Sequence, residues 1–386
     1  MAEYFTHGLV LHLIIFQALI LLVILSNIRL LHQARRHAPP PAFPKVTILI
    51  PARNEENTIA GCIRSLLAQD YPSFEVLVLD DQSSDNTRLL LEHIANIQPR
   101  LKILDGKSPP DGLMGKNWAC AQLAQQAHGD LLFFTDADTL HHPQTLRATV
   151  TALLGTQADM LTGFPRQEVH SWGERLMVPF FSWAILCFIP LALAYRLRWP
   201  ALSSGVGQMM LFRREAYEAI GGHERLGLSI VDDLMLARRI KEAGLRWRVL
   251  YIADLVTCRM YRNSREAFHG LVKNLFAAFG FRLLPYSFVF LWLAVMFWGP
   301  LIILGLMIFG LAPQARASEL AACIGISLLL WLVPYIELGI PLRLAFLYPI
   351  TLLTNEVVAF QSLRLSLTGR LTWKGRALNR TQWRWF

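Results

Sequence analysis

Leu131-Leu132-Phe133-Phe134-Thr135-Asp136-Ala137-Asp138 is the stretch around which the rest of the chain is organised. Its four apolar residues follow a turn-like Gly129-Asp130 and predict a buried strand that ends in two carboxylates. In open α/β sheets, ligands bind at the carboxyl ends of the strands. Two carboxylates there repel each other unless a positive charge neutralises them. A divalent cation, Mg²⁺ or Mn²⁺, is the natural candidate for that positive charge. Without supporting motifs elsewhere in the chain, the same pair of carboxylates would be only the acidic end of a strand that binds no ligand.

The composition indicates a membrane protein with a substantial polar domain. Of 386 residues, 54% are hydrophobic and 17% charged, too apolar for a soluble enzyme and too charged for a pure transporter. The net charge of +9 comes from basic residues beside apolar segments, between Arg29 and Arg36 and between Arg364 and Arg384. This pattern favours a cytoplasmic membrane surface, and no nucleic-acid partner is expected. Five scattered cysteines predict neither a disulfide framework nor a zinc site, and favour a reduced compartment.

The N-terminal region predicts a retained membrane anchor over residues 1–30. An apolar run from Leu9 to Leu25 precedes the first basic cluster, whereas a cleaved signal peptide would carry its charge before the run. The side that follows the anchor is therefore expected in the cytoplasm. Residues 31–44 include a proline-rich segment, which predicts a stiff linker.

The C-terminal region predicts further passage through the membrane over residues 285–363. Three apolar segments there are candidate crossings. Glu337 and Arg343 are costly in lipid and favour a broken or re-entrant passage. With the N-terminus outside and the tail in the cytoplasm, the number of later crossings must be even, so one of the three late segments is not expected to cross fully. Residues 364–386 form a basic tail, which is expected in the cytoplasm.

Between these regions, residues 45–284 alternate between strand and helix patterns. The expected strands are Val46 to Ile50, Phe74 to Leu79, Leu101 to Leu104 and Leu131 to Phe134. Such alternation predicts a largely parallel sheet with right-handed crossovers. The chain lacks a Walker A loop and an early G-x-G-x-x-G, which weakens the ATPase and dinucleotide-binding interpretations.

Five motifs carry a resemblance to a known family. They are Pro51-Ala52-Arg53-Asn54-Glu55-Glu56, Asp80-Asp81-Gln82-Ser83-Ser84-Asp85, Gly115-Lys116-Asn117, Asp136-Ala137-Asp138 and Val231-Asp232-Asp233. In this order and spacing the chain resembles family 2 glycosyltransferases with the GT-A fold. The apolar flanks and Trp373-Lys374-Gly375-Arg376 resemble its membrane-bound, lipid-glycosylating branch. Residues 115–120 and 207–214 are similar to carotenoid- and hopanoid-associated glycosyltransferases.

The resemblance implies an α/β, Rossmann-like GT-A domain that binds a nucleotide sugar, with N- and C-terminal transmembrane helices. It implies that the donor, a UDP-sugar, contacts Pro51, Ala52, Arg53, Glu55, Asp80, Asp81, Lys116 and Asp136. Asp80 and Asp81 could equally serve local Asx-turn chemistry, and both roles can coexist in one loop. Lys116 opens a helix, where it could bind an anion or be a simple exposed cap.

The remaining site residues are also implied by the resemblance. Asp138, with Asp136, would hold the divalent metal, and Asp233, supported by Asp232, would be the catalytic base. For the last pair the plain alternative is a favourable interaction with the helix dipole. The resemblance also implies that Gly207 and Gln208 lie on the acceptor side of the site. It implies that the diphosphate contacts Trp373, Lys374 and Arg376. His141 and His142 could be metal ligands, but solvent-facing loop positions are the expectation for both.

The apolar segment from Met177 to Tyr195 is long enough to cross a membrane. A full crossing would put Asp136 and Asp233 on opposite sides, and Pro179 and Pro190 argue against one straight helix. We therefore expect a membrane-interface insert at about 176–198 in the catalytic domain. The alternative is a buried pair of core helices.

The resemblance implies a multi-pass enzyme of the cell membrane with a cytoplasmic catalytic domain. It would move one sugar, with inversion, to the hydroxyl of a membrane lipid such as a carotenoid or hopanoid. The alternatives are a polyprenyl-phosphate glycosyltransferase and a non-catalytic membrane scaffold with a GT-A domain. Gln382-Trp383-Arg384-Trp385 does not match the Q-x-x-R-W motif of polysaccharide synthases, so processive synthesis is not expected.

Overall fold

The computed structural model describes residues 2–311, 316–373, 376–377 and 383–386. The chain forms two compact units. The sheet unit comprises Arg29–Glu168 and Leu191–Met260. The helical unit comprises Met1–Ile28, Val169–Pro190 and Tyr261–Phe386.

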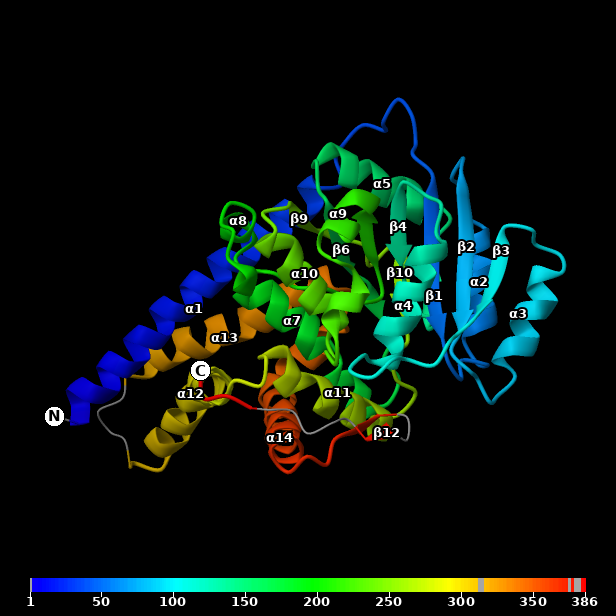
Figure 1. Ribbon diagram of the computed structural model, residues 1–386. Coiled ribbons are helices and arrows are strands. Elements are labelled where there is room, and N and C mark those ends of the chain that lie inside the picture. Colours follow the sequence, from blue (N-terminus) through cyan, green and yellow to red (C-terminus); the bar gives the residue numbers. More distant parts are fainter. Residues whose placement is uncertain (1, 312–315, 374–375, 378–382) are drawn as a thin grey trace. The chain divides into compact units, whose positions relative to one another are not determined.

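A seven-stranded sheet in the order β3-β2-β1-β4-β8-β6-β9 forms the centre of the sheet unit (Figure 1). Its strands are β1 (Val46–Ala52), β2 (Phe74–Asp80), β3 (Leu101–Asp105), β4 (Leu131–Phe134), β6 (Met160–Phe164), β8 (Met210–Arg213) and β9 (Trp247–Tyr251). β8 runs antiparallel to both of its neighbours, and every other pairing is parallel. The predicted largely parallel α/β sheet is therefore confirmed, with β8 as the exception.

Helices and a small second sheet surround these strands. The helical elements are α2 (Ile59–Leu67), α3 (Thr87–Ala95), α4 (Gly115–Gln126), α5 (Thr145–Gly155), α8 (Leu191–Ala194), η1 (Pro200–Leu202), α9 (Arg214–Ala219), η2 (His223–Leu226) and α10 (Asp232–Glu242). The second sheet has the order β5 (Thr139–His141), β10 (Val256–Cys258) and β7 (Arg166–Gln167). All residues of β2 and β4 are buried, as expected for strands covered on both faces.

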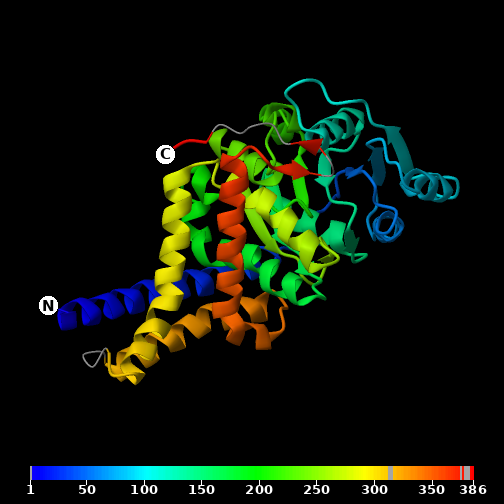
Figure 2. The same cartoon turned by 90° about the horizontal axis from the view of Figure 1, so that it is seen from below.

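Long helices dominate the helical unit (Figure 2). It holds most of α1 (Ala2–Gln33), then α6 (Trp172–Met177), α7 (Pro179–Phe188), α11 (Ser264–Ala278), α12 (Leu283–Ile308), α13 (Ala317–Glu337), η3 (Leu342–Leu347), α14 (Tyr348–Leu367), β11 (Thr372–Trp373) and β12 (Arg376–Ala377). Within the described residues, four stretches are long and apolar enough to cross a membrane: 7–33, 283–308, 317–337 and 342–367. Candidate membrane-spanning helices thus occur toward both ends of the chain, as predicted.

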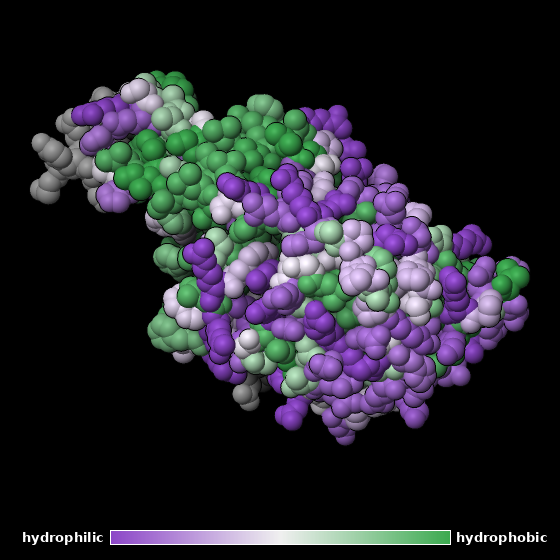
Figure 3. Space-filling model, turned by 90° about the horizontal axis from the view of Figure 1, so that it is seen from above, coloured by the Kyte–Doolittle hydropathy of each residue, from purple (hydrophilic) through white to green (hydrophobic). Residues whose placement is uncertain are grey.

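An exposed apolar stripe runs along α1. Leu11, Ile15, Leu19, Leu22 and Leu25 recur every three or four residues, and each is more than 40% exposed. Figure 3 shows hydrophobic side chains gathered in a continuous area on one face of the molecule, while hydrophilic residues cover much of the remainder. Such extensive apolar exposure marks an interaction surface, and lipid fits helices of this length.

Helix α7 packs inside the helical unit through stacked aromatic rings. The ring centroids of Trp183 and Trp331 on α13 lie 4.0 Å apart, with the planes inclined by 10°. Trp183 Nε1 donates a hydrogen bond to the Leu330 carbonyl at 2.8 Å. The helix ends at Phe188, just before Pro190, which confirms that the segment is not one straight helix. Its relation to the membrane interface stays a prediction.

The burial of β4 generates a stability prediction. Phe133 is completely buried at the centre of the sheet, so Phe133→Ala should lower the free energy of unfolding by about 3–5 kcal/mol. Leu89→Ala is the control, because Leu89 is 65% exposed and should lose less than about 0.5 kcal/mol. Unfolding of both purified variants measures the difference, and equal effects would contradict the assigned core.

Candidate active site

The turn that follows β4 holds Asp136 and Asp138 at the carboxyl edge of the parallel strands. The Thr139 hydroxyl donates to the Asp136 carbonyl at 2.8 Å, and the backbone N–H of Thr135 donates to the Leu49 carbonyl at 3.2 Å. The backbone N–H of Arg259 donates to the Asp138 carbonyl at 3.3 Å. These three hydrogen bonds therefore fix the backbone of the turn that carries both carboxylates.

The loop before β8 packs directly against the first turn of α10. A Cβ at Gly205 would overlap the backbone carbonyl of Asp233, so only glycine permits this approach. The N–H of Gly207 donates to Asp233 Oδ2 at 3.1 Å, and the N–H of Leu234 donates to Oδ1 at 2.7 Å. Both carboxylate oxygens of Asp233 are thereby oriented by backbone donors.

Side chains from three elements converge around Gly207. Lys116 Nζ, at the start of α4, lies 3.0 Å from Asp136 Oδ1 and 3.4 Å from Asp232 Oδ2. A Cβ built on Gly207 would lie 3.3 Å from Asp136 Oδ2 and 3.7 Å from both Asp233 Oδ2 and Lys116 Nζ. Residues predicted from separate motifs thus meet at one point, beside the carboxyl ends of the strands.

Two of the carboxylates are incompletely neutralised. Burial, followed by the negative charges of Asp136 and Glu55, raises the pKa of Asp138 to about 7. Burial and Asp232 likewise raise the pKa of Asp233 to about 7, although Lys116 and the Leu234 N–H oppose this. A carboxyl with a pKa near neutrality can exchange a proton at physiological pH or accept a cation in its place.

Asp232 is the carboxylate that Lys116 keeps ionised. Burial alone would raise the pKa of Asp232, but the opposing effects of Lys116 and His223 lower it below its ordinary value. His223 is fully buried, with its Nε2 3.9 Å from Asp232 Oδ2 and its Nδ1 2.7 Å from the Tyr217 hydroxyl. None of the sequence motifs includes His223, and its place eight residues ahead of Val231 gives no local pattern that points to Asp232.

The loops after β1 and β2 are bound to each other at the same sheet edge. Arg53 Nη1 lies 3.2 Å from Asp81 Oδ2, and the Asp81 N–H donates to the Ala52 carbonyl at 2.8 Å. Asp80 Oδ1 accepts a hydrogen bond from the Ser83 N–H at 3.1 Å. Asp80 therefore forms a local bond from its side chain to the backbone of its own loop, and donor contact stays a prediction.

The other predicted site residues lie in different surroundings. Gln208 is buried, and its carbonyl accepts a hydrogen bond from the Thr135 hydroxyl at 2.8 Å. Trp373 and Arg376 are paired in the small β11–β12 ladder, and Lys374 lies outside the described residues. Pro51 and Ala52 belong to β1.

The expectation of solvent-facing histidines is wrong for His141. This residue lies in β5 and is 5% exposed, and its Nε2 lies 3.1 Å and 2.9 Å from the hydroxyls of Thr135 and Thr139. Burial lowers its pKa to about 3. The alternating pattern of a strand after a tight turn was too short to reveal this. His142 is exposed as expected.

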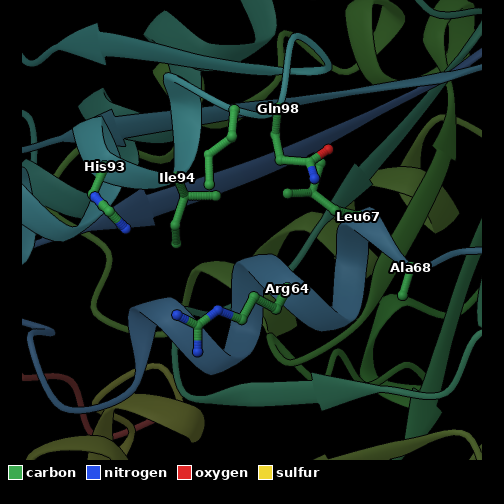
Figure 4. Close-up of a pocket in the computed structure, with 7 residues that line it drawn as sticks. Arg64, Leu67, Ala68, His93, Ile94 and Gln98 are labelled. Atoms are coloured by element: carbon green, nitrogen blue, oxygen red, sulfur yellow. The ribbon is translucent and has the colours of Figure 1, made fainter.

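A separate pocket of about 300 Å³ lies between α2 and α3 (Figure 4). It is lined by residues near the C-terminal ends of these helices, such as Leu67, Ile94 and Gln98. Each helix returns from the carboxyl edge of the sheet toward the start of the next strand, so this pocket lies at the opposite edge from Asp136. None of the predicted site residues lines it.

The chain is similar to a known protein family. The model of Glycosyl transferase family 2 matches residues 47–221, which include β1 to β4, the Asp136–Asp138 turn and β8. Residues 47–221 are thus similar to a family 2 glycosyltransferase domain. The acidic first turn of α10 follows this matched segment.

Two curated relatives carry named activities. Over 237 residues the chain is 27% identical to a beta-monoglucosyldiacylglycerol synthase of Synechocystis sp., covering 56% of this chain and 46% of the relative. Over 118 residues it is 30% identical to UDP-Glc:alpha-D-GlcNAc-diphosphoundecaprenol beta-1,3-glucosyltransferase WfgD of Escherichia coli, covering 31% and 44%. The chain thus spans less than half the length of each.

The family 2 domain also has a solved structural relative. Mannosyltransferase PcManGT from Pyrobaculum calidifontis, in complex with GDP-Man and Mn²⁺, superposes with a TM-score of 0.54 at 21% identity. The superposition covers 93% of this chain and 99% of that protein. It supports the predicted GT-A fold.

The single lysine of the site generates a second prediction. Lys116→Met leaves Asp232 buried without its cation, which should lower the free energy of unfolding by about 1–3 kcal/mol. The range lies between those of exposed and buried pairs because the Lys116 side chain is 42% exposed. Lys107→Met removes an exposed lysine and is the control. Adding Asp232→Asn to Lys116→Met should restore part of the loss, and the absence of any rescue would contradict the pairing.

Proposed function

We propose that this protein is an inverting glycosyltransferase that moves a sugar from a UDP-sugar to the hydroxyl of a membrane lipid. The observation that carries the proposal is the convergence of Asp136, Asp233 and Lys116 around Gly207. A side chain suited to bind the donor and a side chain suited to accept a proton lie beside the same glycine. The family 2 domain and the four candidate membrane helices support the two halves of the proposal.

The donor would occupy the carboxyl edge of β1, β2 and β4. Arg53, Glu55, Asp80 and Asp81 lie on the paired loops after β1 and β2, where carboxylates can accept hydrogen bonds from a base or ribose. Lys116 opens α4, and a helix N-terminus beside a lysine favours a phosphate. Pro51 and Ala52 would contribute backbone contacts.

Asp233 would act as the general base, with Asp232 supporting it. The acceptor hydroxyl gives its proton to Asp233 while its oxygen bonds to the anomeric carbon of the sugar. The bond from that carbon to the diphosphate oxygen breaks, and its electron pair leaves with the nucleoside diphosphate. One direct displacement inverts the anomeric configuration. Two backbone donors hold the Asp233 carboxylate for this step, and its pKa near 7 suits proton acceptance.

Asp138 and Asp136 would hold a divalent cation, Mg²⁺ or Mn²⁺. The fit rests on Asp138, whose ionised form is opposed by burial and by the charges of Asp136 and Glu55. The Cys258 thiol, a weak donor, lies 3.6 Å from Asp138 Oδ1. Among the described residues no three His, Cys, Asp or Glu side chains are grouped to hold a metal, so donor oxygens and water would complete the coordination. When bound, such a cation stabilises charge on a leaving diphosphate.

The proposed acceptor is a hydroxylated lipid such as a carotenoid or hopanoid, with Gly207 and Gln208 on the acceptor side. The name of the Synechocystis relative refers to a glycolipid synthase, which supports a lipid acceptor in general. The name of the WfgD relative refers to a diphosphoundecaprenol substrate, which favours a polyprenyl-linked acceptor as the second candidate. Trp373, Lys374 and Arg376 remain proposed contacts toward the diphosphate.

The experiment that tests the proposal supplies a panel of nucleotide sugars to membranes that contain the protein. Mass spectrometry of the extracted lipids should show one added sugar on a hydroxylated lipid, with UDP as the released nucleotide. A product bearing the sugar on a polyprenyl phosphate would favour the second candidate. If the membranes form no glycosylated lipid and also hydrolyse no nucleotide sugar, the protein would be a non-catalytic scaffold.

Substitution of the two key carboxylates should separate their roles. Asp233→Asn cannot take a proton and should reduce transfer to lipid by roughly 10²–10⁴-fold while donor affinity stays near native. Asp138→Asn, or EDTA with the unmodified protein, should weaken donor binding as well. A helix-dipole role alone would cost Asp233→Asn only about 0.3–1 kcal/mol of stability and leave transfer within a few-fold of native. Donor affinity and transfer measured on the same preparations decide between them.

We also propose that the catalytic domain and the C-terminal tail face the cytoplasm, because basic residues follow the first apolar run and fill the tail. Single cysteines at Gln33 and Thr368 should then react with an impermeant thiol reagent only from the cytoplasmic side. All five native cysteines are buried, which keeps the background low. Labelling of the two positions from opposite sides would show that the proposed number of crossings is wrong.

A further inference from the structure

A second pocket in the sheet unit lies between α8 and the far end of α10. It has a volume of about 190 Å³ and is lined by residues 194–198, 241 and 244–248. We call it the basic pocket. Pockets for whole small molecules usually measure about 300–1,000 Å³, so this one suits a small group rather than a nucleotide sugar. None of the proposed donor or catalytic residues lines it.

Five cationic side chains and no acidic one line the basic pocket. The cations are those of Arg196, Arg198, Lys241, Arg246 and Arg248. None of them forms a side-chain ion pair with an acid in the described part of the chain. Burial lowers the pKa of Arg248, and the positive charge of neighbouring Arg246 lowers it further. Burial and the charge of Arg248 lower the pKa of Lys241 to about 8. The folded chain thus keeps like charges together at an energetic cost that an anion would relieve.

Neutral groups position several of these cations. Lys241 Nζ donates to the carbonyls of Ala194 and Leu202 at 2.7 and 3.3 Å, which makes it a structural cross-link. The Arg248 guanidinium stacks on the Tyr195 ring at 4.3 Å and donates to the Trp247 carbonyl at 2.9 Å. These contacts satisfy donors without cancelling charge.

Three further arginines line the pocket. Arg246 donates to the Gln157 side chain, again a neutral partner. The Arg198 guanidinium carbon would lie 3.4 Å from a Cβ on Gly244, whose φ of +73° also favours glycine. Arg198 is therefore held over the end of α10. Arg196 and Arg198 are exposed and form no ion pair among the described residues, so they are available to a ligand.

Apolar side chains flank the arginines along the chain. Leu193 is 50% exposed and Trp199 is 64% exposed, on either side of Arg196 and Arg198. Exposed tryptophan and leucine beside arginine are typical of segments that lie at a membrane surface. This arrangement favours a ligand presented by lipid, although the pocket itself recognises only charge and oxygen acceptors.

We propose that the basic pocket binds a phosphate group, carried by the head of an anionic phospholipid or free in solution. Guanidinium groups donate paired hydrogen bonds to phosphate oxygens, and several of them around one small hollow match a tetrahedral oxyanion. The pocket adjoins the C-terminal end of α10, whose first turn carries Asp232 and Asp233 about 15 Å away by helix length. The binding requires neither donor nor catalysis, so it is independent of the proposed activity.

The test uses the full chain purified in an uncharged detergent, with ionic strength matched by sodium chloride. Its Tm is measured against inorganic phosphate, and against micelles containing phosphatidylglycerol or, as the neutral comparison, diacylglycerol. The pocket variant is Arg196→Gln with Arg198→Gln. The control, Arg64→Gln with Arg166→Gln, removes the same charge from exposed sites elsewhere. Arg246→Gln is a second, single pocket variant.

We expect a saturable rise in Tm with the native chain and the control variant. The pocket variant should bind about tenfold more weakly or worse, as for the loss of one or more charge-assisted hydrogen bonds. A response to both inorganic phosphate and phosphatidylglycerol supports recognition of the phosphate group alone, and a response to phosphatidylglycerol only supports a lipid source. The proposal is overturned if neither ligand raises the Tm, or if pocket and control variants respond alike.

Discussion

The repulsion among carboxylates at one edge of the sheet is the constraint on which the site depends. Asp136, Asp138, Asp232 and Asp233 are held there, and Lys116 contacts two of the four. Folding alone therefore leaves excess negative charge, which together with burial, the larger cause, raises the pKa of Asp138 and Asp233 to about 7. The fold tolerates this because backbone donors and a buried core fix the loops. The site is organised before any ligand arrives, with charge left for the ligand to balance.

The antiparallel strand β8 links the two halves of this arrangement. It pairs with β4, which precedes the Asp136 turn, and its preceding loop supplies the glycines that fit against α10. A residue with a side chain at Gly205 would displace the Asp233 backbone. The Asp136 turn and the first turn of α10 therefore keep a fixed spacing through one short connection. This spacing is set within the sheet unit.

Prediction from the sequence succeeds where a hydrophobic pattern and an acidic motif occur together. The apolar run of β4, its acidic exit and the acidic first turn of α10 are all present as predicted. It fails where contacts between distant parts of the sequence determine a residue's surroundings. His141 is buried because β10 pairs with β5, and His223 lies beside Asp232 only because the fold brings η2 and α10 together. Nor could spacing alone show that Gly207 is the point of convergence. The basic pocket combines residues 194–198 with 241–248, which no local pattern connects.

The position of β8 also sets the timing of assembly during synthesis. It lies in the middle of the sheet but begins 76 residues after β4 ends (210 − 134), beyond the apolar α7. At roughly 5–20 residues per second, the ribosome needs about 4–15 s to deliver it. For that interval one edge of β4 stays unpaired in the nascent chain, and open strand edges invite aggregation. Production of this protein should therefore respond to translation speed and chaperone supply more than its final stability would indicate.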